Sequence, residues 1–192
     1  MTDINQTIDT VLAVFRNRGH EEYHGEPVSQ LEHAVQAAEL AQEGHPDDPE
    51  FIIAAFLHDY GHLCAPAHGE NGMDGYGVRE HELVGARELA RLGFSDKIAN
   101  LVAGHVQAKR YLVSTDPVYY MALSEASKIT LEKQGGLLPP EEQKEFEQDP
   151  MFRLHLALRR LDERAKVSDQ PVGNLDWLEK LMREHLEGKA EQ

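Results

Sequence analysis

Four histidines recur at a spacing that suits a shared metal site. The segment FLHDYGHL (residues 56–63) carries His58, Asp59 and His62 in an otherwise apolar run, where leucine would suit a protein core better. The four histidines, at intervals of 25, 23 and 24 residues, are His33, His58, His81 and His105. Each interval is about one helix and one turn, so a helical bundle can aim one imidazole from each helix at a common interior point.

Imidazole and carboxylate donors together bind iron, manganese, cobalt and similar ions. Asp59 has two carboxylate oxygens and can therefore bridge two metals. Asp162 is the candidate for a sixth ligand, because it follows Leu158 and Leu161 on the apolar face of a predicted helix. One His-Asp pair is common by chance, but four histidines at one per helix favour a dimetal site.

The elements that must position these residues are predicted to be helices. Alternating strand patterns are almost absent, whereas helix start and stop signals recur, so we expect an all-α fold of about eight to ten helices. Ser29 and Glu32 form a capping box ahead of the helix that carries His33, and Asp48 with Pro49 begins the next helix.

The second of these helices is expected to carry His58 and to end at Gly61. The glycine-rich stretch at 68–77 predicts a loop before a helix with His81 in its first turns, and Ser95 caps the helix that carries His105. A stripe of alanines in the first helix predicts close packing against the second. These alanines are Ala34, Ala37, Ala38 and Ala41.

Composition limits the class of protein. A formal charge of −15 argues against a nucleic-acid or membrane surface as partner, because both are anionic. The first ten residues have neither the basic nor the apolar region of a targeting signal, and Cys64 is the sole cysteine, so we expect a cytoplasmic protein. The length of 192 residues predicts one domain.

The remaining histidines are interpreted as solvated surface residues, because they lie in predicted loops or on charged faces. They are His20, His24, His45, His68, His155 and His185.

The order H…HD…H…H…D resembles the HD-domain superfamily in its two-metal form. The resemblance covers about residues 28–165 and implies a helical bundle over 1–192, with a metal-binding core at 28–165 and a C-terminal helical extension at 170–192. It implies His33, His58, Asp59 and Asp162 as the basic ligand set, with His81 and His105 completing the second site. Ligand type alone does not separate the hydrolases of this superfamily from its diiron oxygenases.

A closer resemblance, to the HD-domain hydroxyphosphonate dioxygenases, runs over about residues 20–165. It is carried by YHGEPVSQLEHA, HDYGH, GYGVREHELVGA, LGFS, GHVQAKRYLVS, SEASKITLEKQGG and LRRLDE. It implies two iron ions in a mixed-valent Fe(II)/Fe(III) pair and O2 as co-substrate. The substrate would be 1-hydroxy-2-aminoethylphosphonate or its trimethylammonio analogue, cleaved to phosphate and glycine or glycine betaine. It also implies an upstream phosphonate hydroxylase that supplies this substrate.

The same resemblance implies roles for residues around the metals. Tyr23 would close the open iron position until substrate arrives, and Glu26 would meet the cationic nitrogen of the substrate. The phosphonate would be held by cationic and hydroxyl donors. These are His62, Lys109, Ser127, Thr130 and Arg159. Arg160 is interpreted as an ordinary solvated cation.

Two other functions stay open at this point. A binuclear HD phosphohydrolase acting on a nucleotide or another phosphate ester needs the same six ligands, but it needs neither Tyr23 nor Glu26. A non-catalytic metal-binding or regulatory module is the third reading, and the intact ligand set argues against it.

Overall fold

The chain forms a bundle of helices around the predicted ligands. The computed structural model describes residues 3–23, 25–65 and 72–190, and within these ranges the only β pairing is two isolated bridges, Glu22 with Ser29 and Gly72 with Val78. The all-α prediction is therefore confirmed. The helices are α1 (Ile4–Arg18), α2 (Gln30–Gly44), α3 (Pro49–Leu57), α4 (Tyr60–Cys64), α5 (His81–Arg91), α6 (Asp96–Thr115), α7 (Pro117–Ala122), α8 (Glu125–Lys133), α9 (Pro140–Phe146), α10 (Phe152–Arg164) and α11 (Asp176–Ala190).

The predicted caps begin the helices that carry the ligands. The Ser29 hydroxyl accepts a hydrogen bond from the Glu32 backbone N–H at 3.2 Å, and the Glu32 carboxylate accepts one from the Ser29 N–H at 2.6 Å. The Asp48 side chain caps α3 by accepting a hydrogen bond from the Phe51 N–H, and the Ser95 hydroxyl caps α6 by accepting one from the Ile98 N–H. Local sequence thus fixes where α2, α3 and α6 start.

One predicted helix end is wrong. The helix predicted to carry His58 and to end at Gly61 ends at Leu57, so His58 directly follows it, and α4 begins at Tyr60. Asp59, with φ −99° and ψ 10°, leaves helical geometry and turns the chain between the two helices. Gly61 lies inside α4, where its lack of a side chain lets this helix approach α5.

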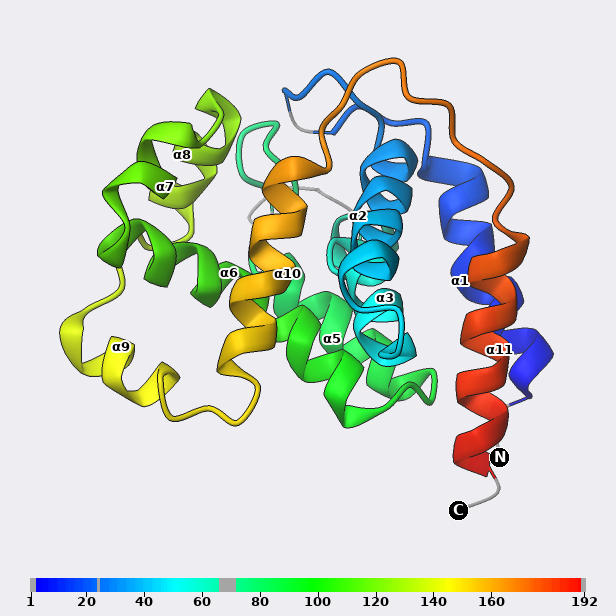
Figure 1. Ribbon diagram of the computed structural model, residues 1–192. Coiled ribbons are helices and arrows are strands. Elements are labelled where there is room, and N and C mark those ends of the chain that lie inside the picture. The colour runs from blue at the N-terminus through cyan, green and yellow to red at the C-terminus, as the bar shows by residue number, and fades with distance from the viewer. Residues whose placement is uncertain (1–2, 24, 66–71, 191–192) are drawn as a thin grey trace.

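The core lies between α2, α3, α6 and α10. The alanine stripe of α2 is at most 4 % exposed and α2 contacts α3, as predicted. Figure 1 shows α2, α3 and α10 together in the middle of the molecule, with α1 and α11 side by side on one flank and α7, α8 and α9 on the other. Because α10 contacts α2, α3 and α6, it brings Asp162, the last candidate ligand, close to the helices that position His33, His58 and His105.

The C-terminal helix joins the main core. Leu178, Met182 and Leu186 of α11 are buried in the same hydrophobic cluster as α1 and α3. Among the described residues, no helix has both the length and the apolar character required to cross a membrane.

Candidate metal centre

Four helices and the junction between two others bring the six predicted ligands to one buried point. The ligands come from α2, the α3–α4 junction, α5, α6 and α10, and each is at most 8 % exposed. They are His33, His58, Asp59, His81, His105 and Asp162. Their side chains form two groups of donors that share Asp59.

The first group is built on His33 and His58. Their Nε2 atoms lie 3.0 Å apart. Oδ2 of Asp59 lies 3.6 Å from Nε2 of His33 and 3.4 Å from Nε2 of His58. Asp162 closes the group, with Oδ1 at 3.5 Å from His33 and Oδ2 at 3.8 Å from His58. Donors bound at about 2.1 Å to one ion lie about 3 Å from their neighbours, so these separations suit a single metal.

The second group is built on His81 and His105. Their Nε2 atoms also lie 3.0 Å apart. Oδ1 of Asp59 lies 3.1 Å from His81 and 3.4 Å from His105. Because the two oxygens of Asp59 face different histidine pairs, this carboxylate is placed to bridge two ions.

Backbone carbonyls hold three of the imidazoles in the orientation that metal binding needs. Nδ1 of His33 lies 2.8 Å from the Ala165 carbonyl oxygen, and Nδ1 of His58 lies 2.8 Å from that of Ala55. Nδ1 of His105 lies 2.7 Å from the carbonyl oxygen of Val102. A proton on each Nδ1 donates to its carbonyl, which directs Nε2 into the centre, where a metal ion would take the place of a proton.

The ionisation of the carboxylates also fits a metal. Burial raises the pKa of Asp162, but Arg159 and the histidines outweigh it and hold this pKa below its usual value. Burial likewise opposes ionisation of Asp59, but His58, His105 and His81 together outweigh it, so the pKa of Asp59 is held well below its usual value. Oδ1 of Asp162 is buried without a hydrogen-bond partner in the described structure. An ionised, buried oxygen that faces histidine nitrogens and has no hydrogen-bond partner is suited to bind a cation.

The predicted substrate residues line one pocket beside this centre. Tyr23, Glu26 and His62 form part of its wall. The cationic and hydroxyl donors, Lys109, Ser127, Thr130 and Arg159, form another part. The structure thus brings together every residue that the sequence singled out, and the volume of the pocket is about 40 Å³.

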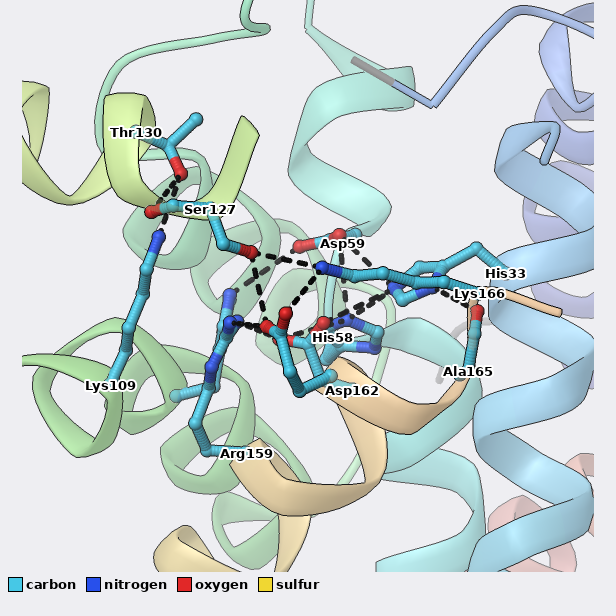
Figure 2. Close-up of polar contacts among 12 residues, drawn as sticks. His33, His58, Asp59, Lys109, Ser127, Thr130, Arg159, Asp162, Ala165 and Lys166 are labelled. Carbon is cyan, nitrogen blue, oxygen red and sulfur yellow. Dashed lines mark hydrogen bonds and ion pairs between the residues drawn. The ribbon is translucent and has the colours of Figure 1, made fainter. Parts of the chain in front are cut away.

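Two buried basic side chains in the pocket wall, those of Lys109 and Arg159, bond to neighbouring residues. Nζ of Lys109 donates to the Thr130 hydroxyl at 2.7 Å and to Gln134 at 3.1 Å, as Figure 2 shows for Thr130. Burial lowers the pKa of Lys109 well below its usual value, with nearby Arg159 adding to the effect. Arg159 donates to the Tyr119 hydroxyl at 2.8 Å and forms an ion pair with Asp162.

Tyr23 and His62 lie against the two histidine groups. The ring of Tyr23 stacks on His33 with centroids 3.9 Å apart, and burial raises its pKa well above the usual value, reinforced by Asp59. The ring of His62 stacks on His81 at 3.7 Å. Nδ1 of His62 accepts a hydrogen bond from the Val78 N–H at 2.9 Å, so its proton is on Nε2.

Sequence reasoning missed Lys166. Its Nζ lies 2.9 Å from Oε1 of Glu26, 2.9 Å from the Ser127 hydroxyl and 3.1 Å from Glu163. Lys166 is four residues beyond Asp162, the spacing at which Lys109 follows His105. A search for basic residues one helical turn beyond each candidate ligand would have found it.

The interpretation of the remaining histidines needs correction. His155 is buried, because Gly104 has no side chain and the imidazole lies against the backbone of α6. The side chain of His185 is 8 % exposed and lies beside Phe94. His20 is exposed as expected, and His45 is half-buried.

His24 and His68 lie outside the described residues. The side chain of Arg160 is 52 % exposed and pairs with Asp116, in line with the role of a solvated cation.

Comparisons with known proteins agree with this geometry. The HD domain family model matches residues 30–149. An uncharacterized protein of Acanthamoeba polyphaga mimivirus is 41 % identical over 187 residues, covering 97 % of this chain and 84 % of the relative. The [1-hydroxy-2-(trimethylamino)ethyl]phosphonate dioxygenase (glycine-betaine-forming) of Leisingera caerulea is 43 % identical, covering 84 % and 81 %.

A third relative, the hydroxymethylphosphonate dioxygenase of Gimesia maris, is 39 % identical and covers 88 % of this chain and 83 % of its own length. Asp162 lies beyond the part matched by the family model, and the structure brings it to the centre through α10. The chain belongs to the HD domain family and is related to its phosphonate dioxygenases.

Proposed function

We propose that this protein is an O2-dependent dioxygenase that cleaves the carbon–phosphorus bond of a 1-hydroxyphosphonate. In this reaction C1 loses its hydrogen and its bond to phosphorus and becomes a carboxylate. One oxygen atom of O2 enters the carboxylate and the other enters phosphate, and the electrons that reduce O2 come from the substrate. The products are phosphate and a carboxylic acid that keeps C1 and its substituent.

The observation that carries the proposal is the placing of two buried basic side chains beside the two donor groups that share Asp59. Lys109 and Arg159 lie in the same pocket wall as Asp59 and Asp162. A phosphonate is a compact anion that needs such donors, and its C1 hydroxyl needs a metal within reach of the same pocket. The relatives that act on phosphonates give independent support.

The six ligands fit two metal ions, which we propose to be iron as a mixed-valent Fe(II)/Fe(III) pair. When bound, the irons supply the redox chemistry by which O2 reacts and a Lewis acid for the hydroxyl. The chain itself binds, orients and shields. His62, Lys109, Ser127, Thr130 and Arg159 orient the phosphonate, Tyr23 covers the open position before substrate binds, and Glu26 faces the substituent on C1.

This activity belongs to phosphonate catabolism, and we place it in the cytoplasm. The substrate would come from a hydroxylase that installs the 1-hydroxyl on a phosphonate. A hydroxylase has to act first, because the substrate needs the 1-hydroxyl in order to bind a metal.

The test is to load the purified chain anaerobically with iron and then measure O2 uptake and phosphate release together. The panel contains hydroxymethylphosphonate, 1-hydroxy-2-aminoethylphosphonate, its trimethylammonio analogue and a set of nucleotides. We expect equal amounts of O2 consumed and phosphate released with at least one hydroxyphosphonate, and no activity in Asp59→Ala. Phosphate released from an ester without O2 would instead identify a phosphohydrolase.

A further inference from the structure

His81 differs from the other three histidine ligands in what faces its Nδ1 atom. In the other three, Nδ1 lies 2.7 or 2.8 Å from a backbone carbonyl oxygen. Nδ1 of His81 has no hydrogen-bond partner among the described residues, and it lies 3.5 Å from Oε2 of Glu82, the next residue of α5. A carboxylate therefore stands where a neutral carbonyl stands at the other imidazoles.

The Glu82 carboxylate has no other partner at this oxygen. Oε2 is buried without a hydrogen-bond partner in the described structure, although the side chain as a whole is 13 % exposed. Within the described ranges, the only ion pair of Glu82 is the one with His81. A buried polar atom without a partner is costly, and a hydrogen bond between Nδ1 of His81 and Oε2 of Glu82 would remove two such costs at once.

The rest of the His81 ring is already held. Its Nε2 lies 3.1 Å from Oδ1 of Asp59 and 3.0 Å from Nε2 of His105, and the ring of His62 stacks on it with centroids 3.7 Å apart. A neutral imidazole carries one proton, so an ion at Nε2 puts that proton on Nδ1, beside Glu82. The 3.5 Å separation has to shorten by only about 0.6 Å to become an ordinary N–H···O hydrogen bond.

The two groups of metal ligands are also unequal in charge. The first group has oxygens from two carboxylates, Asp59 and Asp162, whereas the second group has only Oδ1 of Asp59 beside its two histidines. A carboxylate behind one of those histidines supplies negative charge that the second group lacks. Glu82 is suited to this role because, among the described residues, it is not part of the pocket wall.

We propose that Glu82 is a positioning residue for the second group of metal ligands, and that its carboxylate accepts the Nδ1 proton of His81 when an ion binds at Nε2. A charged acceptor holds the imidazole and raises its basicity more than a neutral carbonyl does. Glu82 has this role only within the metal centre of the proposed function, on which the inference rests.

The experiment measures Fe(II) binding to the metal-free protein by anaerobic calorimetry. His33→Ala removes a donor of the first group, so the ion that remains reports on the second group, and His105→Ala does the reverse. Glu82→Gln keeps the shape of the side chain and removes its charge. We expect it to weaken Fe(II) binding by about tenfold or more in the His33→Ala background. In the His105→Ala background we expect no change.

A redox titration of the iron-loaded protein separates this role from a packing role. Negative charge near an ion favours its oxidised form. At a fixed ambient potential, Glu82→Gln should therefore lower the ratio of oxidised to reduced iron by about tenfold, which corresponds to a rise of about 59 mV in midpoint potential. Glu82→Asp keeps the charge, so both of its values should lie between those of the wild type and those of Glu82→Gln.

Glu88→Gln is the matched control. It removes an equal charge from the same helix, where Glu88 pairs with Arg91 at 2.6 Å, and should change neither the Fe(II) affinity nor the redox ratio. Calorimetry gives the dissociation constant separately from the number of binding sites, so a partial loss of folded protein does not alter the comparison.

The proposal is overturned if the wild type binds only one ion per chain, or if Glu82→Gln has the same effect in both histidine backgrounds. An unchanged redox ratio in Glu82→Gln would also overturn it. Fe(II) affinity requires no reaction with O2. A protein that consumes no O2 with any phosphonate would therefore refute the dioxygenase function, while the affinities would still decide the role of Glu82.

Discussion

Gly61 and His81 approach so closely that a Cβ on Gly61 would lie 1.9 Å from the His81 carbonyl oxygen. The same Cβ would lie 2.8 Å from the backbone nitrogen of Gly85. The helix that follows Asp59 is therefore packed backbone to backbone against the helix that presents His81. This contact sets the distance between the bridging carboxylate and the second histidine group.

Replacing Gly61 with alanine should therefore damage both stability and metal binding. The backbones must move apart, and overpacking of this kind costs about 1–3 kcal/mol in the free energy of unfolding. We expect Gly61→Ala to lower that free energy in urea titrations and to reduce metal content. Gly188→Ala is the matched control, because a Cβ there meets nothing within 4 Å. Equal stability of the two variants would show that α4 and α5 can separate freely.

The bridging position of Asp59 predicts how metal content responds to each ligand. Asp59→Ala removes a donor from both groups, whereas His33→Ala and His105→Ala each remove a donor from one group. From about two ions per chain, we expect loss of both in Asp59→Ala and retention of about one in each histidine variant. Elemental analysis after iron loading gives the counts, with His20→Ala as the surface control. Equal losses in all three ligand variants would contradict the bridge.

Tyr23 is expected to act on the centre without being required to hold metal. Its ring stacks on His33, and its phenol is kept neutral because burial raises its pKa well above the usual value. Tyr23→Phe keeps the stacking ring but loses the hydroxyl. We expect normal iron content, a changed absorption spectrum of the resting iron-loaded protein, and faster O2 consumption without substrate. An unchanged spectrum with full activity would rule out the covering role.

His155 gives the stability of the metal-free protein a component that depends on pH. Burial lowers its pKa below the usual 6.5, opposed in part by the Asp149 carboxylate at 3.6 Å. The unfolded chain therefore takes up this proton at a higher pH than the native chain. The contribution of His155 to stability is full above about pH 6.5 and falls as the pH drops through that value.

His155→Phe fills the same space without a titrating group. The loss of unfolding free energy between pH 7.5 and pH 5.5, chosen as about one unit on each side of the usual histidine pKa, should be smaller in this variant than in the wild type. Urea unfolding of both metal-free proteins at the two values measures the difference. An equal or larger loss in His155→Phe would mean that His155 is protonated as readily in the native state as in the unfolded chain.

Much of the fold and of the centre was predictable because the relevant signals are local. Ser29 and Asp48 cap their helices through residues three positions away. The recurring histidines fall one to a helix, so their convergence follows from the packing of neighbouring helices. Asp162 was found by helical periodicity alone, and the structure brings it to His33.

Other features depend on segments that meet only in the folded chain. The burial of His155 depends on the missing side chain of Gly104, and the position of Gly61 inside a helix depends on the approach of α5. The pairing of Glu26 with Lys166 joins the two ends of the predicted core. Residue type and spacing by themselves predicted the candidate metal ligands that the structure brings together, because helix geometry repeats along the chain. Only the tertiary structure decided which cationic side chain pairs with Glu26, because the energy of an ion pair depends on distance in space and not on distance in sequence.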